Sequence, residues 1–222
     1  MIRNALGIGV ATGAYGLSFG AISSGAGLSV LQSCVLSLAM FTGASQFAFV
    51  AVVGGGGNPF AGTATAVLLG ARNALYGLRL SSLLGLRRRA RPVAAHLVID
   101  ESAAMTLATE SYRSGRLGFW ATGLAVFVLW NTATLIGAVA AHALPGPKEL
   151  GLDAAVPAAF LALLAPRLVS RRLWLVATTA AATGLVSVPF VPAGVPVLLG
   201  ALVAVVMGAR PPPPGGATGG SG

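Results

Sequence analysis

The sequence predicts an all-α integral membrane protein, a polytopic helical bundle of about six to seven transmembrane segments, some of them short or broken. The composition is the first observation: 55% of the residues are hydrophobic, 9% are charged and the mean hydropathy is +0.84, whereas soluble domains carry about 25% charged residues. The second is a series of long uncharged stretches separated by polar turns. The third is that thirteen of the fourteen basic residues are arginines, mostly in short runs at the ends of apolar segments. Such runs are typical of the cytoplasmic side of a membrane.

We expect one transmembrane domain over residues 1–210 and a disordered tail, rich in proline and glycine, over residues 211–222. A formal net charge of +9 would indicate a nucleic-acid partner in a soluble protein. Here the arginines flank apolar segments, so we interpret the charge as a topology signal. The single cysteine, Cys34, lies in an apolar stretch and excludes an intrachain disulfide; we interpret it as a packing residue.

The stretch from Leu28 to Val53 contains no charged side chain and predicts a transmembrane helix. At 1.5 Å per residue, residues 30–53 would form a helix about 36 Å long, which is enough to cross a bilayer with some tilt. Thr42, Ser45 and Gln46 lie near its middle. Polar side chains there are costly in lipid, so they should face protein, water or a ligand, and Gly43 beside them lets another backbone approach closely.

The flanking stretches predict two further spans. The segment from Ala5 to Ser24 is rich in glycine, which fits either a tightly packed helix or a discontinuous one of the kind that lines transporter sites. The segment from Pro59 to Leu84 carries Arg72 near its middle. An arginine at that depth should face the bundle interior and find an anion, either the carboxylate of a substrate or an acid elsewhere in the chain.

Residues 92–112 are apolar but interrupted by charged side chains. A spacing of four predicts His96 and Asp100 on one face of a helix, with Glu101 about 100° around it. Such a segment could offer acids to Arg72, or take up protons. We favour a partly buried or re-entrant segment; the alternative is an amphipathic helix on the cytoplasmic surface with solvated charges.

The rest of the chain predicts a clear span over residues 117–141, a short proline-containing segment over 153–165, and two last spans over 173–190 and 194–209. The arginine run at residues 87–91 is the strongest topology marker and belongs on the cytoplasmic side. Six full spans then place the N-terminus outside and the C-terminus inside.

Several strings together resemble the AzlC (YgaZ) family, the large subunits of branched-chain amino acid exporters. The strings that carry the resemblance are Ser18-Phe19-Gly20, Ala26-Gly27-Leu28-Ser29, Phe41-Thr42-Gly43-Ala44-Ser45-Gln46-Phe47, residues 72–77, Asp100-Glu101 and Leu152-Asp153-Ala154-Ala155-Val156-Pro157-Ala158. The chain departs from the family's usual Asn-x-Arg-His where it has Gly70-Ala71-Arg72-Asn73, so only the role of the arginine transfers. The resemblance implies export of leucine, isoleucine and valine through the cytoplasmic membrane by a multi-pass protein, usually with a small hydrophobic AzlD-type partner subunit. We expect no cofactor or metal.

A zwitterionic amino acid needs partners for its carboxylate and its ammonium, and an apolar pocket for its side chain. Arg72 and the polar patch at Ser45 and Gln46 are candidates for the carboxylate, Asp100 or Glu101 for the ammonium, and Met40, Phe41 and Phe47 for the apolar pocket. The complete candidate set for substrate binding or coupling is Gly43, Ser45, Gln46, Arg72, Asn73, Tyr76, Asp100 and Glu101.

Three other functions compete with a carrier. A membrane enzyme is disfavoured, because His96 and His142 are far apart and the chain has neither an HExxH nor a Gly-x-Ser-x-Gly string. An ion channel and a structural subunit of a membrane complex stay as alternatives. Because the chain carries no ATP-binding motif, we expect secondary transport.

Overall fold

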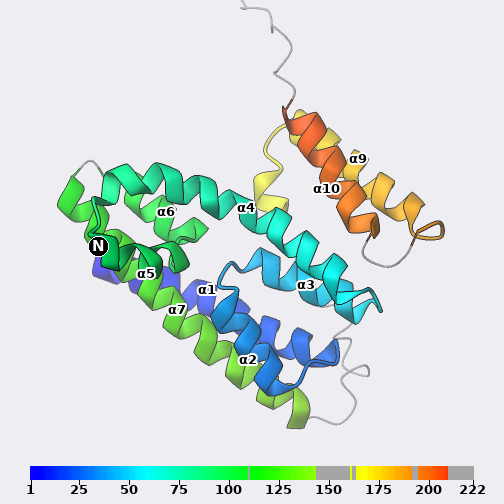
Figure 1. The fold of residues 1–222 in the computed structure, drawn as a ribbon, viewed down its shortest axis with the longest axis horizontal. Helices are drawn as coiled ribbons and strands as arrows, with labels where there is room; N and C mark the ends of the chain where they lie inside the picture. The colour runs from blue at the N-terminus through cyan, green and yellow to red at the C-terminus, as the bar shows by residue number, and fades with distance from the viewer. Residues whose placement is uncertain (110, 144–160, 162–163, 192–194, 210–222) are drawn as a thin grey trace, which may run out of the picture. The chain divides into compact units, whose positions relative to one another are not determined.

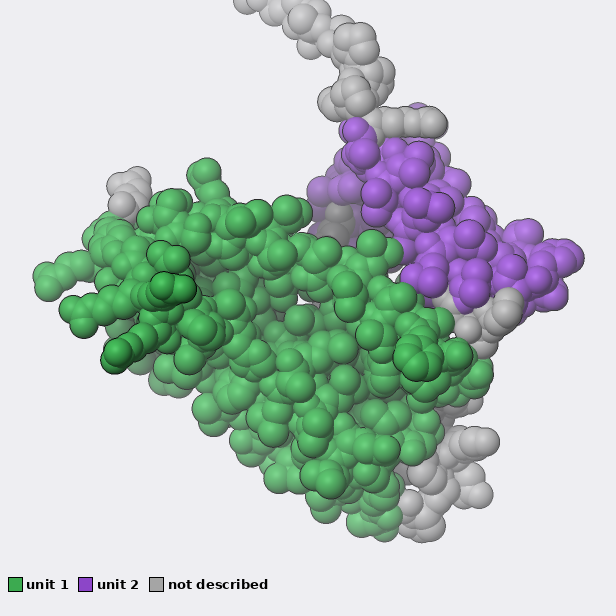
Figure 2. Space-filling view, viewed as in Figure 1, with its two compact units in different colours: residues 1–161 green, residues 162–222 purple. Residues whose placement is uncertain are grey.

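The computed structural model describes residues 1–109, 111–143, 161, 164–191 and 195–209 (Figure 1). All the regular structure in these ranges is helical, as predicted. Contacts divide the chain into two compact units, Met1–Leu161 and Ala162–Gly222, coloured separately in Figure 2. The expectation of one transmembrane domain over 1–210 stays a prediction. Glu110, most of 153–165 and the tail 211–222 lie outside the described residues.

The first unit contains seven of the described α-helices and one 3-10 turn. Their bounds are α1 Ile2–Gly25, α2 Val30–Ala39, α3 Ala44–Gly54, α4 Pro59–Leu84, η1 Arg88–Ala90, α5 Arg91–His96, α6 Asp100–Leu107 and α7 Tyr112–Ala143. Among the described helices, α1 and α7 are the two that are long and apolar enough to cross a membrane by length and composition. The count of six to seven spans therefore stays a prediction.

Glycine lets α1 and α7 pack backbone to backbone, so that they run side by side (Figure 1). A Cβ added at Gly16 would lie 2.6 Å from the carbonyl oxygen of Trp130, and one added at Gly20 would collide with the carbonyl of Thr134. In the other direction, Gly137 of α7 faces the carbonyl of Leu17. Of the two alternatives for the glycine-rich first segment, tight packing is the one observed, since α1 is continuous from Ile2 to Gly25.

The predicted single helix over residues 28–53 is wrong, because the chain leaves the helix in its middle. Helix α2 ends at Ala39, and α3 begins at Ala44. Gly43, just before α3, has φ 60° and ψ −89°, a backbone conformation that side-chain-bearing residues rarely adopt. The discontinuous helix is therefore the second apolar segment of the chain and not the first.

The single helix expected over residues 92–112 is also interrupted. Helix α5 ends at His96, and Ile99 is extended with φ −130° and ψ 170° before α6 begins at Asp100. The hydroxyl of Ser102 accepts a hydrogen bond from the Ile99 amide at 3.1 Å and donates one to the Leu97 carbonyl at 2.7 Å, which holds this turn. His96 and Asp100 thus belong to different helices, and their expected position on one helical face is wrong. Partial burial is observed, since Leu97, Val98 and Ile99 are all buried.

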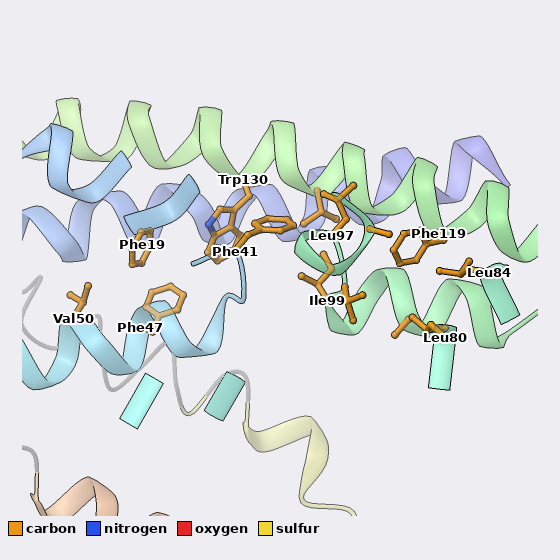
Figure 3. Packing of buried hydrophobic residues seen from close by; sticks show 14 of the residues in the cluster. Phe19, Phe41, Phe47, Val50, Leu80, Leu84, Leu97, Ile99, Phe119 and Trp130 are labelled. Atoms are coloured by element: carbon orange, nitrogen blue, oxygen red, sulfur yellow. The ribbon is translucent and has the colours of Figure 1, made fainter. Parts of the chain in front are cut away.

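The core of the first unit extends along α7 (Figure 3). Three aromatic rings from three helices meet in it. Phe19 of α1 lies edge-to-face against Phe47 of α3 at 5.5 Å between ring centroids, and it stacks on Trp130 of α7 at 6.2 Å. Phe47 is 1% exposed within this core, and its expected place in a substrate pocket stays a prediction.

The second unit contains the turn η2 Ala165–Arg167 and two packed helices, α9 Arg171–Ser187 and α10 Val195–Ala209. The bounds of these helices agree closely with the last two predicted spans. The guanidinium of Arg172 donates to the carbonyls of Met207 and Gly208, at 3.3 and 3.4 Å. A cation there also interacts favourably with the C-terminal end of the α10 dipole.

Candidate functional site

A cavity of about 610 Å³, much of it open at the surface, lies in the first unit beside both helix breaks. Its wall takes residues from three parts of the chain: the α2–α3 break, the middle of α4, and the end of α5 with the turn that follows. Those used below are Ala39, Met40, Phe41, Thr42, Ser45, Gly70, Asn73, His96 and Val98. Pockets of roughly 300 to 1,000 Å³ are the size that holds small organic ligands.

The break between α2 and α3 gives the cavity one of its polar edges, in a wall that is mostly apolar. Ser45 lies in the first turn of α3 and Thr42 just before it, and both line the cavity. The amides of a helix's first turn have no helical acceptors, and that end of the dipole favours an anion. Ser45 also lies close to α4, since a Cβ added at Gly70 would be 3.3 Å from its hydroxyl oxygen.

Gln46 holds the break in place. It is fully buried, and its Nε2 donates to the Ser37 carbonyl at 3.2 Å. Ser37 in turn donates its hydroxyl to Thr134 of α7 at 3.3 Å. The Gln46 Oε1 has no partner among the described residues. Gln46 therefore stabilises the break from within the buried core, whereas Ser45 lines the cavity.

Arg72 and Asp100 form an ion pair between α4 and α6, with Arg72 Nη2 lying 3.1 Å from Asp100 Oδ2. Of the two anions considered for Arg72, the structure pairs it with an acid of its own chain. The two side chains are 32% and 24% exposed, so the pair is accessible. Asp100 lies in the first turn of α6, where the helix dipole also favours a carboxylate. Both sides of the pair adjoin the cavity along the chain, because Asn73 and Val98 line it.

The remaining candidates divide between the cavity and the packing around it. The buried Oδ1 of Asn73 has no hydrogen-bond partner in the described part of the chain. Tyr76 is half-buried and packs against the hydrophobic core. Glu101 is half-buried in the first turn of α6. Gly43 acts through its backbone, at the start of α3.

A ring cluster that the sequence did not predict borders the same cavity. Phe41 of the break packs edge-to-face on Phe127 of α7 at 5.0 Å between centroids, and the His96 ring lies 6.0 Å from Phe41 and 5.7 Å from Phe127. Phe41 and His96 both line the cavity. No local pattern could have found this cluster, because its members come from three separate segments.

The described residues contain no group of three or more histidine, cysteine, aspartate or glutamate side chains placed to hold a metal ion. What the site does offer is apolar area, hydroxyl and amide groups, and one ion pair.

Apolar helices and a cavity between two broken helices are typical of membrane transport proteins. The chain belongs to such a family: the family model described as AzlC protein matches residues 7–144, and the chain is a member of the AzlC family. The match covers both breaks, the cavity and the Arg72–Asp100 pair. Searches of curated proteins and of solved structures gave no match.

Proposed function

We propose that this chain is the large subunit of a multi-pass secondary transporter that exports branched-chain amino acids across the cytoplasmic membrane, together with a small hydrophobic AzlD-type subunit. The observation that carries the proposal is the cavity bordered by two helix breaks, with apolar side chains on its wall and with an ion pair whose two residues adjoin its lining residues along the chain. Transporters commonly bind substrates where helices are discontinuous, because unwound segments expose backbone groups and helix ends to the ligand.

The chemistry of the cavity fits leucine, isoleucine and valine. Met40, Phe41 and Val98 supply apolar contacts for a branched side chain. Ser45 and the first turn of α3 can add donors for a carboxylate to those of Arg72. Every residue named here, together with the other candidates, lies within the stretch that the family model matches.

The test is amino acid flux in proteoliposomes holding the purified chain, with and without the co-expressed small subunit. We expect saturable leucine flux that is accelerated by leucine on the opposite side of the membrane, and that is larger with the partner. Large unsaturable ion currents would instead identify a channel. An assembled complex with neither activity would favour a structural subunit.

Two neighbouring residues at the end of α2 provide a matched pair of variants for this assay. Ala39 lines the cavity, whereas Leu38 is 47% exposed and does not line it. Ala39→Trp should fill the cavity and abolish leucine flux, and Leu38→Trp should leave the flux close to that of the wild type. Equal flux in the two variants would show that this cavity is not the substrate route.

A further inference from the structure

We propose that a zwitterionic amino acid binds by exchanging with the Arg72–Asp100 ion pair, so that Arg72 takes the ligand's carboxylate and Asp100 takes its ammonium. The inference rests on the proposed function and adds a charge requirement to it: the ligand must carry both charges next to each other. No covalent bond is made or broken. One ion pair within the protein is replaced by two between the protein and the ligand.

The position of the pair makes the exchange feasible. It joins α4 to α6 at 3.1 Å, and on each helix it adjoins a segment that lines the cavity. The immediate neighbour of Arg72, Asn73, lines the cavity, as does Val98, two residues before Asp100. Exposures of 32% and 24% leave both charged groups open to a competing ligand without disruption of the buried core.

The charge balance selects a zwitterion. In the empty protein each member of the pair compensates the other. A ligand with only a carboxylate would break the ion pair between Arg72 and Asp100 and supply no cation in its place, and a ligand with only an amine would break the same pair and supply no anion in its place. Removing one partner from a partly buried pair is costly, whereas replacing both partners is close to neutral. A zwitterion supplies both replacements at once.

The two protein groups also suit the two ligand groups. A guanidinium can form two parallel hydrogen bonds to a carboxylate, which fixes the orientation of the ligand. The Asp100 carboxylate sits in the first turn of α6, so the helix dipole continues to stabilise its negative charge after Arg72 turns away. Because the charge exchange itself is nearly balanced, the affinity comes from the apolar side chain in the cavity.

The test compares three ligands with the same branched carbon chain: leucine, isocaproate, which lacks the amine, and isoamylamine, which lacks the carboxylate. Binding to the purified complex is measured by calorimetry or by thermal shift. The wild type should bind leucine and discriminate against the other two. In Asp100→Asn, Arg72 is released from its partner, so isocaproate should bind about tenfold tighter or more than it binds to the wild type. In Arg72→Gln, Asp100 is released from Arg72, so isoamylamine should bind more tightly than it binds to the wild type, by a similar factor.

Reciprocal gains of this kind separate exchange from a purely structural tie, which would only weaken binding. The Arg72→Gln/Asp100→Asn double variant has no charges at the position and should bind the three ligands with similar affinities. Arg79→Gln is the matched control, since Arg79 is exposed on the same helix, about two turns further on, and it should keep the wild-type ranking. Melting temperatures establish that each variant is folded.

The outcomes distinguish this inference from the proposed function. If leucine is transported but neither single variant gains its predicted ligand, the exchange is wrong and the transporter stands. If the variants gain isocaproate and isoamylamine while no leucine flux is observed, the exchange stands and the proposed export is wrong. If no variant binds any of the three ligands, the exchange is wrong.

Discussion

The side-chain amide of Gln46 crosses the break between α2 and α3 and donates a hydrogen bond of 3.2 Å to the backbone carbonyl of Ser37. In a continuous helix that carbonyl would accept from the amide four residues later, at Phe41. Phe41 lies in the break. The Gln46 side chain therefore replaces the hydrogen bond that α2 loses at its end, so that the Ser37 carbonyl has a donor within the protein.

The first prediction concerns this replacement. Gln46→Leu keeps a similar volume but leaves the Ser37 carbonyl without its donor, so the free energy of unfolding should fall by about 1–3 kcal/mol. Gln46→Glu should be no better, because a carboxylate places an oxygen against the carbonyl oxygen. Thermal unfolding in detergent measures both changes. The control is Gln32→Leu, which replaces an exposed glutamine in the first turn of α2. It should lower the free energy of unfolding by less than Gln46→Leu does. A Gln46→Leu variant as stable as the wild type would show that the break does not depend on this bond.

The second prediction uses two glycines of α1 with opposite surroundings. A Cβ at Gly20 would collide with the Thr134 carbonyl of α7, whereas one at Gly7 meets nothing within 4 Å. Gly20→Ala should therefore force the helices apart and lower stability by about 1–3 kcal/mol. Gly7→Ala should raise stability by about 0.5–1 kcal/mol, because alanine is the better helix former. Melting temperatures of the purified proteins show whether each variant is more or less stable than the wild type. Stability changes in the same direction for both variants would contradict the observed packing.

The sequence allowed some of these features to be predicted, because their causes are local or compositional. The bounds of α4 follow from Pro59 at its first turn and Gly85 after its end, which adopts φ 51°. The glycine spacing in α1 favoured close packing. Arg72, as a charge in the middle of an apolar segment, needed an anion, and Asp100 was among the candidates.

The cavity and both helix breaks could not be predicted in the same way. The uncharged stretch from residue 28 to 53 has the composition of one long helix, and what interrupts it is the φ of Gly43 together with the reach of Gln46 back to Ser37. The turn before Asp100 likewise depends on the hydroxyl of Ser102. The cavity then depends on contacts between segments that are far apart in the sequence, which a periodic pattern does not contain.

The third prediction tests the orientation inferred from the arginine runs. Arg89 and Arg3 are both exposed. The topology inferred from the arginine runs places them on opposite sides of the membrane, but the structure places them at the same end of the α1–α7 pair. Helices α1 and α7 are parallel, since Gly9 faces Ala125 and Gly20 faces Thr134, and the Tyr112 hydroxyl at the start of α7 donates to the Leu84 carbonyl shortly before the arginine run. We therefore expect the N-terminus on the same side as Arg89, and not outside.

In a Cys34→Ser background, which removes the native thiol, Arg89→Cys should react with a membrane-impermeant maleimide only after the cells are permeabilised. Arg3→Cys should likewise react only after permeabilisation, because it lies at the same end of the α1–α7 pair. Labelling of both variants in intact cells would reverse the orientation, and labelling of Arg3→Cys alone in intact cells would contradict the parallel arrangement of α1 and α7.

The last prediction separates the role of the α2–α3 break in function from its role in folding. Gly43 and Gly56 both have positive φ, 60° and 78°, and an added Cβ meets nothing within 4 Å at either position. Gly43→Ala and Gly56→Ala should therefore carry a similar backbone cost, of order 1–3 kcal/mol, and lower the melting temperature by similar amounts. Only Gly43 lies between Thr42 and Ser45 at the edge of the cavity. Leucine flux per folded molecule should consequently fall severalfold or more in Gly43→Ala, because a shifted break moves the polar edge of the site, and should stay at the wild-type level in Gly56→Ala. Flux is measured in proteoliposomes and normalised to the monodisperse protein recovered. Equal losses of flux in the two variants would mean that the break matters for stability alone, and normal flux in both would show that the conformation of Gly43 is not required for transport.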